Sequence, residues 1–148
     1  MIVFGFGFRS NATVDSFRSA FENTISKHKF SKPLVVAVPL DKVNHNALIL
    51  FAREIGCKIL AINPSDIESM QTETNSAMSE RFRNTGSVSE ACALVAAGSE
   101  AELIVFREIS ADRRATCSMA KGINYNRFGS TIWPTFVGLG CRVRFSKY

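Results

Sequence analysis

The opening of the chain carries residue types that bind anions. An apolar, β-prone run over residues 2–4 is followed by Gly5, Gly7, Arg9 and Ser10. A strand that turns at glycines and enters a helix brings backbone N–H groups beside a guanidinium, and both favour negative charge. The G-x-G spacing lacks the third glycine of the dinucleotide fingerprint and is weak evidence for a nucleotide. Taken alone, the segment favours a plain tight turn between strand and helix, with an anion-binding turn as the alternative.

A second glycine-serine turn precedes a helix further along the chain. Thr85, Gly86 and Ser87 lead into a run of small apolar residues that ends at Gly98. Ser87 and Glu90 have the S-x-x-E spacing of a capping box, which places Ser87 at the N-cap. We expect Glu90 to act as a capping residue rather than as a general base. The turn before it repeats the anion-binding arrangement of the first segment.

Composition and charge narrow the class of protein and of ligand. The 148 residues are 46% hydrophobic and 21% charged, with a net charge of +5, as expected of a folded globular domain. The arginines are dispersed and form no block of like charge, which disfavours a nucleic-acid-binding tail and suits acidic small molecules. No apolar run approaches the roughly 20 residues that span a bilayer. We therefore expect neither a nucleic-acid nor a membrane partner.

The cysteines and histidines argue against a disulfide framework or a metal site. The four cysteines are widely spaced and form no C-x-x-C pair. Because the first residues do not resemble a secretion signal, we expect reduced thiols in a cytoplasmic protein. His28 and His45 lie outside any metal-binding spacing. We predict no structural metal and no cofactor.

The two glycine-bearing segments need a scaffold that alternates strands and helices. The hydrophobic pattern predicts strands at 2–4, 34–38, 57–62, 103–106 and 115–120, and helices at 14–28, 47–55, 65–70 and 88–97. Thr13 is the expected N-cap of the first helix, Pro39 ends the second strand and Gly56 ends the second helix. We expect a single α/β domain at residues 1–122, with three α/β/α layers and a mixed, mostly parallel sheet. Residues 71–79 are predicted to form a polar surface loop. For residues 123–148 the sequence leaves open an edge strand, a partner contact or a poorly packed extension.

Taken in order, these motifs resemble those of the CobE family, the stand-alone relatives of the C-terminal domain of CbiG in cobalamin biosynthesis. The resemblance covers about residues 2–121 and is carried by the following segments: the G-x-G-x-R opening at 5–9, the K-x-x-[EH] connection at Lys42 and His45, the T-x-S loop at Thr74 and Ser76, the G-x-V-x-E-A-x-A-L segment at 86–94, and the closing strands at 103–107 and 115–117. Phe8 stands where many relatives have cysteine, and Ser10 where many have arginine.

The resemblance implies a role in building the corrin ring, whose intermediates are macrocycles that bear many carboxylate side chains. On this interpretation the ligand is a corrinoid or precorrin, and the candidate binding residues are Gly5, Gly7, Arg9, Ser10, Lys42, His45, Thr85, Gly86, Ser87 and Glu90. Arg107 is a further candidate cation. His45 is the first candidate for a base. We assign no catalytic residue, because no Ser-His-Asp or Cys-His arrangement can be recognised.

The sequence leaves three hypotheses for function. In the first, the protein binds a tetrapyrrole intermediate of the aerobic cobalamin pathway and holds it or hands it over. In the second, it is a hydrolase related to cobalt-precorrin-5A hydrolase, the lactone-opening enzyme that releases acetaldehyde. In the third, it is a partner subunit whose residues 123–148 dock another cobalamin-pathway enzyme.

Overall fold

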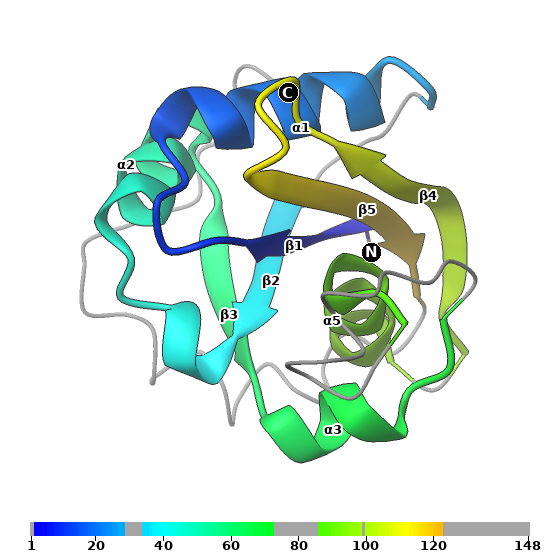
Figure 1. Ribbon diagram of the computed structural model, residues 1–148. Coiled ribbons are helices and arrows are strands. Elements are labelled where there is room, and N and C mark those ends of the chain that lie inside the picture. Colours follow the sequence, from blue (N-terminus) through cyan, green and yellow to red (C-terminus); the bar gives the residue numbers. More distant parts are fainter. Residues whose placement is uncertain (1, 29–33, 73–85, 99, 123–148) are drawn as a thin grey trace.

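Five strands build one mixed sheet in the order β3-β2-β1-β5-β4 (Figure 1). The computed structural model describes residues 2–28, 34–72, 86–98 and 100–122. The strands are β1 (Ile2–Phe8), β2 (Leu34–Pro39), β3 (Lys58–Ile62), β4 (Glu102–Ile109) and β5 (Ala115–Lys121). β1 pairs in parallel with β2, and β2 with β3, whereas β5 is antiparallel to both β1 and β4. Because only β5 among these strands runs against the others, the predicted α/β fold with a mixed, mostly parallel sheet is confirmed.

Helices cover both faces of the sheet. α1 (Val14–Ile25) and α2 (Asn46–Ile55) pack against each other on one face, and α5 (Val88–Ala97) lies on the other. A 3-10 turn, η1 (Leu40–Lys42), follows β2, and the short helix α3 (Pro64–Ser69) lies against α5. None of these helices is both long and apolar enough to cross a membrane.

Local capping explains where the helices begin and end. Thr13 is the N-cap of α1 and forms a capping box with Ser16, in which each side chain accepts from the backbone N–H of the other residue. Ser87 caps α5, and Gly56 ends α2 with a left-handed φ of 69° that suits glycine. These three predictions are confirmed, because capping depends on residues only a few positions apart.

Strand β1 presents a different kind of side chain to each face of the sheet. Successive side chains of a strand point to opposite faces, and here phenylalanine alternates with glycine. Phe4 and Phe6 meet the aromatic rings of α1 and α2, with ring centroids 5.0 Å apart for Phe4 and Phe21 and 5.6 Å for Phe6 and Phe51. All four of these rings are buried in the core.

Gly5 and Gly7 lie within β1 and not in a turn, so the predicted glycine turn is wrong. Neither glycine has a positive φ. Their role is to let α5 approach the sheet: a Cβ on Gly5 would clash with the carbonyl oxygen of Ser89 and lie 2.6 Å from the backbone nitrogen of Ala93. The strand continues past both glycines to Phe8 because its two faces are each covered by a helix.

Several boundaries differ from those predicted. Pro39 is the last residue of β2 and pairs with Ile62, and α1 ends at Ile25, before His28. β4 is longer than predicted at both ends and carries register shifts between Leu103 and Glu108. Thr74, Ser76 and Thr85, most of the 71–79 loop and the whole 123–148 segment lie outside the described residues.

Candidate functional site

Three connections meet at the carboxyl edge of the parallel strands. They are the β1–α1 loop (residues 9–13), the segment 40–45 between β2 and α2, and the β4–β5 hairpin loop (110–114). The first two meet because β1 and β2 are parallel, and the third because β5 starts where β1 ends, with Phe8 opposite Ala115. In open α/β sheets, ligands bind outside the carboxyl ends of the strands. This edge is therefore the candidate site.

His45 joins two of these connections. Its Nε2 lies 2.8 Å from the carbonyl oxygen of Ser10, to which it donates. Its ring meets Phe8 edge-on at 5.0 Å between centroids, and its Nδ1 is buried without a hydrogen-bond partner in the described structure. One ring nitrogen is thus occupied and the other is shielded. The structure brings His45 and Ser10, both predicted binding residues, into contact, but neither nitrogen is presented to a substrate as a base would be.

Lys42 and Arg9 bring positive charge to the same place. The Lys42 ammonium lies 5.5 Å from the centroid of the Phe8 ring, a cation–π distance. Arg9 directly follows Phe8 and is exposed, as is Ser10. Lys42 and His45 therefore contact the Phe8 ring, and His45 also bonds to Ser10, although these residues come from two segments more than 30 positions apart in the chain.

The hairpin supplies two cations that the sequence did not assign to the site. The backbone N–H of Arg9 donates to the carbonyl oxygen of Arg114 at 2.9 Å, which extends the β1–β5 ladder by one pair. Arg113 and Arg114 are both exposed. The position of these arginines beside Arg9 depends on the pairing of β1 with β5, across about 100 residues, and no local sequence pattern indicates it.

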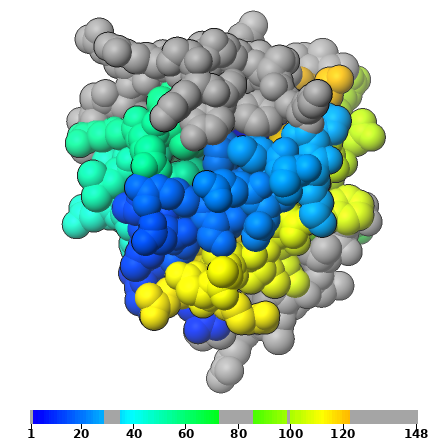
Figure 2. All heavy atoms as spheres, turned by 90° about the horizontal axis from the view of Figure 1, so that it is seen from above, coloured from blue at the N-terminus to red at the C-terminus, as the bar shows by residue number. Residues whose placement is uncertain are grey.

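Asp112, in the hairpin loop, places its carboxylate at the N-terminal end of α1. Its carboxylate accepts from the hydroxyl groups of Ser16 and Ser110, the latter at 2.6 Å, and from the backbone N–H of Arg114 at 3.1 Å. These bonds, led by those from the two serines, hold the pKa of Asp112 below its ordinary value. Figure 2 shows the hairpin, in yellow, packed along α1 and next to the darker blue of the preceding loop. The positive end of the α1 dipole thus faces one of the chain's own carboxylates.

The start of α5 lies beside β1 but inside the molecule. A Cβ on Gly7 would lie 3.1 Å from that of Val88, so the first turn of α5 adjoins the end of β1. Gly86, Ser87 and Glu90 are all buried. Ser87 is linked through Ser89 to Ser118 of β5 by hydroxyl contacts of 3.3 and 2.8 Å. Gly86 and Ser87 are therefore part of the interior, where α5 packs against the sheet, and are not exposed at the edge.

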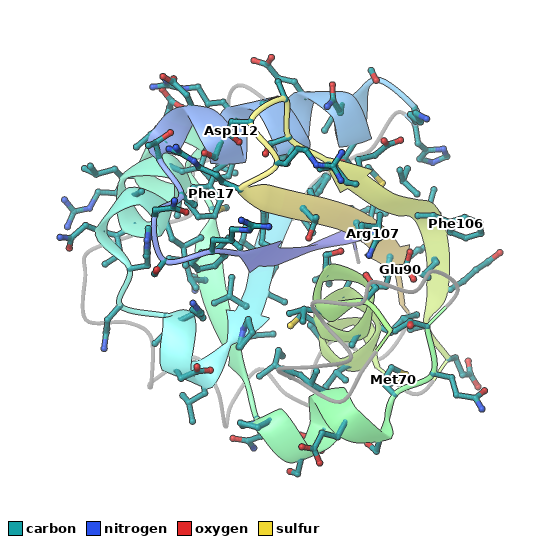
Figure 3. All side chains as sticks on the ribbon, viewed as in Figure 1. Phe17, Met70, Glu90, Phe106, Arg107 and Asp112 are labelled. Carbon is teal, nitrogen blue, oxygen red and sulfur yellow. The ribbon has the colours of Figure 1, made fainter. Side chains whose placement is uncertain are left out.

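Glu90 bonds to the edge strand of the sheet. Its Oε2 accepts from the backbone N–H of Arg107 at 2.9 Å, where the β4–β5 register shifts, and Ser87 Oγ accepts from the backbone N–H of Glu90 at 3.4 Å. Figure 3 shows Glu90 and Arg107 together between α5 and β4, with Phe106 on the outer side. Arg107 is level with the middle of β1, away from Arg9. Of the predicted residues, the exposed Arg9 and Ser10 and the half-buried Lys42 are available for contact, whereas Gly5, Gly7, Gly86, Ser87 and Glu90 are buried.

Other reactive groups in the described part of the chain are poorly placed for chemistry. Cys57, Cys92 and Cys117 are buried, and burial raises the pKa of the Cys117 thiol well above its ordinary value. No group of three or more His, Cys, Asp or Glu residues that could hold a metal ion occurs among the described residues. The candidate site is therefore an exposed cationic edge with an aromatic ring at its centre.

Comparison with known proteins identifies the family. A family model for the cobalamin synthesis G C-terminus matches residues 2–120. The chain belongs to this family. It is thus a cobalamin biosynthesis protein of the CobE/CbiG type, as the sequence motifs indicated. No curated protein matches the sequence.

Solved structures share the fold of this family member. CobE, a protein from the cobalamin biosynthetic pathway, has a TM-score of 0.74 and 22% identity over 83% of this chain and 91% of its own. The cobalamin biosynthesis protein chiG from Agrobacterium tumefaciens has a TM-score of 0.60 and 24% identity over 84% of this chain and 100% of its own. A cobalamin biosynthesis protein G homologue from Sulfolobus solfataricus has a TM-score of 0.59 and 18% identity over 80% of this chain, which matches 36% of that longer protein.

Proposed function

We propose that this protein binds a corrin-ring intermediate of cobalamin biosynthesis at the carboxyl edge of β1 and β2. Such intermediates combine an apolar macrocycle with many carboxylate side chains. The observation that supports binding here is the Lys42 ammonium over the Phe8 ring, with the exposed Arg9 next to Phe8 in the chain. Charge-assisted hydrogen bonds to carboxylates and contact with the ring would act together.

The described residues favour binding over hydrolysis. Opening a lactone requires a base to activate water and donors that stabilise the oxyanion. At this edge the Nε2 of His45 is bonded to Ser10 and its Nδ1 is shielded, while Glu90 of α5 is buried and accepts from the Arg107 N–H. We therefore propose a protein that holds or transfers the intermediate.

Spectroscopic titration with hydrogenobyrinic acid tests this proposal, because the corrinoid chromophore reports on its own environment. We expect saturable binding at micromolar ligand. Arg9→Gln should weaken it by about tenfold, the effect of one charge-assisted hydrogen bond. Lys121→Gln removes an equal charge at the opposite end of β5 and serves as the control.

Two results would contradict the proposal. One is the absence of binding at micromolar corrinoid. The other is release of acetaldehyde from the lactone-bearing precursor by the purified protein, which would make it a hydrolase of the type suggested by its family resemblance.

A further inference from the structure

The β4–β5 hairpin places two exposed arginines beside the proposed site. We propose that Arg113 and Arg114, together with Arg9, form an arginine subsite that binds neighbouring carboxylates of a polyacid ligand. This inference rests on the proposed function and extends it by naming a part of the site that the sequence motifs did not include.

The first argument is that two arginines pair directly opposite each other across the end of the strand ladder. β1 and β5 pair with Phe8 opposite Ala115, and the bond from the Arg9 N–H to the Arg114 carbonyl places these two arginines opposite each other in the next pair. Like charges in directly opposed positions destabilise an antiparallel pair. An anion bound between the two guanidinium groups would relieve that repulsion.

The second argument is the backbone conformation of Arg113. Its φ is 61°, and it is the one non-glycine residue with positive φ in the part of the chain that the structure describes. A bulky side chain is disfavoured in this left-handed region, where glycine or asparagine is usual. Such strain is concentrated at functional sites. The presence of arginine at this position is explained if its guanidinium group binds a carboxylate of the ligand.

The third argument is that the hairpin is held firmly and its acidic residue is occupied. Three side chains of α1 bond to the hairpin. Ser16 Oγ donates to the Asp112 carboxylate, and Asn23 Nδ2 donates to the Ile109 carbonyl oxygen at 3.2 Å. Ser19 Oγ accepts from the Ala111 N–H at 2.9 Å. Asp112 attracts Arg114 but already accepts bonds from two hydroxyl groups and a backbone N–H. The arginines are therefore presented on a fixed support.

The chemistry of the subsite selects ligands with more than one carboxylate. Each guanidinium presents a planar fork that matches a carboxylate, and neighbouring forks suit carboxylates on adjacent side chains of one molecule. Arg113 has no ion pair among the described residues, whereas Arg18 of α1 and Lys27, two residues beyond its end, pair with acidic residues. We expect Arg113 to contribute more than Arg114, whose charge is partly balanced by Asp112.

The test compares Arg113→Gly and Arg114→Gln with the control Lys121→Gln in the full chain. Glycine suits the φ of residue 113, so the thermal midpoint of Arg113→Gly should not fall, and any loss of binding reports the guanidinium. Two probes are used: hydrogenobyrinic acid, followed by absorbance, and citrate, a small tricarboxylate, followed by NMR shifts of the hairpin amides. We expect Arg113→Gly to weaken binding of both by about tenfold, Arg114→Gln by less, and Lys121→Gln by less than twofold.

The outcomes separate this inference from the proposed function. If the corrinoid binds the parent and the three variants equally, and the substitutions do not change citrate binding either, the arginine subsite is overturned and the proposed function stands. If the corrinoid does not bind, but citrate binds at the hairpin and binds more weakly to Arg113→Gly, the proposed function fails and the arginine subsite stands. If citrate and the corrinoid both fail to bind, both are overturned.

Discussion

His45 connects the β1–α1 loop to the start of α2 through its side chain. As the N-cap residue of α2 it makes no capping bond with that side chain, and its Nε2 instead donates to the Ser10 carbonyl. Because a carbonyl oxygen only accepts, this bond requires a hydrogen on Nε2, while Nδ1 is buried without a partner in the described structure. Phe8 and Phe17 hold the ring from its sides. The residue therefore positions Arg9 and Ser10.

Replacing His45 by glutamine or by leucine separates positioning from catalysis. The glutamine amide can donate to the Ser10 carbonyl, whereas leucine fills the space without a donor. We expect His45→Leu to lower the free energy of unfolding by about 1 kcal/mol, the worth of one hydrogen bond, and to speed amide exchange over residues 9–12. His45→Gln should stay within about 0.5 kcal/mol of the parent and keep its corrinoid affinity. Equal loss of function in both variants, with stability retained in His45→Gln, would instead indicate a base.

At the scale of elements, the close packing of α5 on β1 depends on the glycines of that strand. The helix approaches closely because β1 offers glycines to it, and the two glycines differ in how much room they leave. A Cβ on Gly5 would overlap the backbone of α5, whereas one on Gly7 would meet Val88 Cβ and Thr116 Oγ1 at 3.1 Å. The first position cannot relax without moving the helix.

Gly5→Ala and Gly7→Ala test this difference. Overpacking a closed interface typically costs about 1–3 kcal/mol. We expect Gly5→Ala to lower the free energy of unfolding by about 3 kcal/mol, measured by urea denaturation, and Gly7→Ala by about 1 kcal/mol, because small side-chain shifts relieve its contacts. Similar losses in the two variants would show that α5 does not rest on the backbone of β1.

At the scale of the whole molecule, the fold could be predicted from the sequence further than the site could. Helix caps at Thr13, Gly56 and Ser87 follow from short-range patterns, and the order of strands and helices indicates an α/β sheet. The glycines of β1 were wrongly predicted to form a turn, because local sequence patterns associate glycine with turns. In the structure they instead make room for α5, which comes from a distant part of the chain. The site was incomplete for the same cause. Arg9 and Arg114 meet only through the pairing of β1 with β5.

The acid stability of the molecule should depend on Asp112, which joins α1 to the hairpin at one end of the sheet. Its pKa is lowered in the folded protein, chiefly by the hydrogen bonds from Ser110 and Ser16. The folded state therefore binds this proton less readily than the unfolded chain, whose ordinary value is about 4. The stabilisation is present above that pH and is lost as pH falls through the lowered folded value.

The gap in unfolding free energy between the parent and Asp112→Asn, measured in urea from pH 7 to pH 2.5, should thus be constant near neutrality and shrink below about pH 4. Ser16→Ala keeps the carboxylate but removes one donor, so its pH dependence should lie between those two. A gap that stays constant down to pH 2.5 would mean that the charge of Asp112 does not stabilise the junction between α1 and the hairpin.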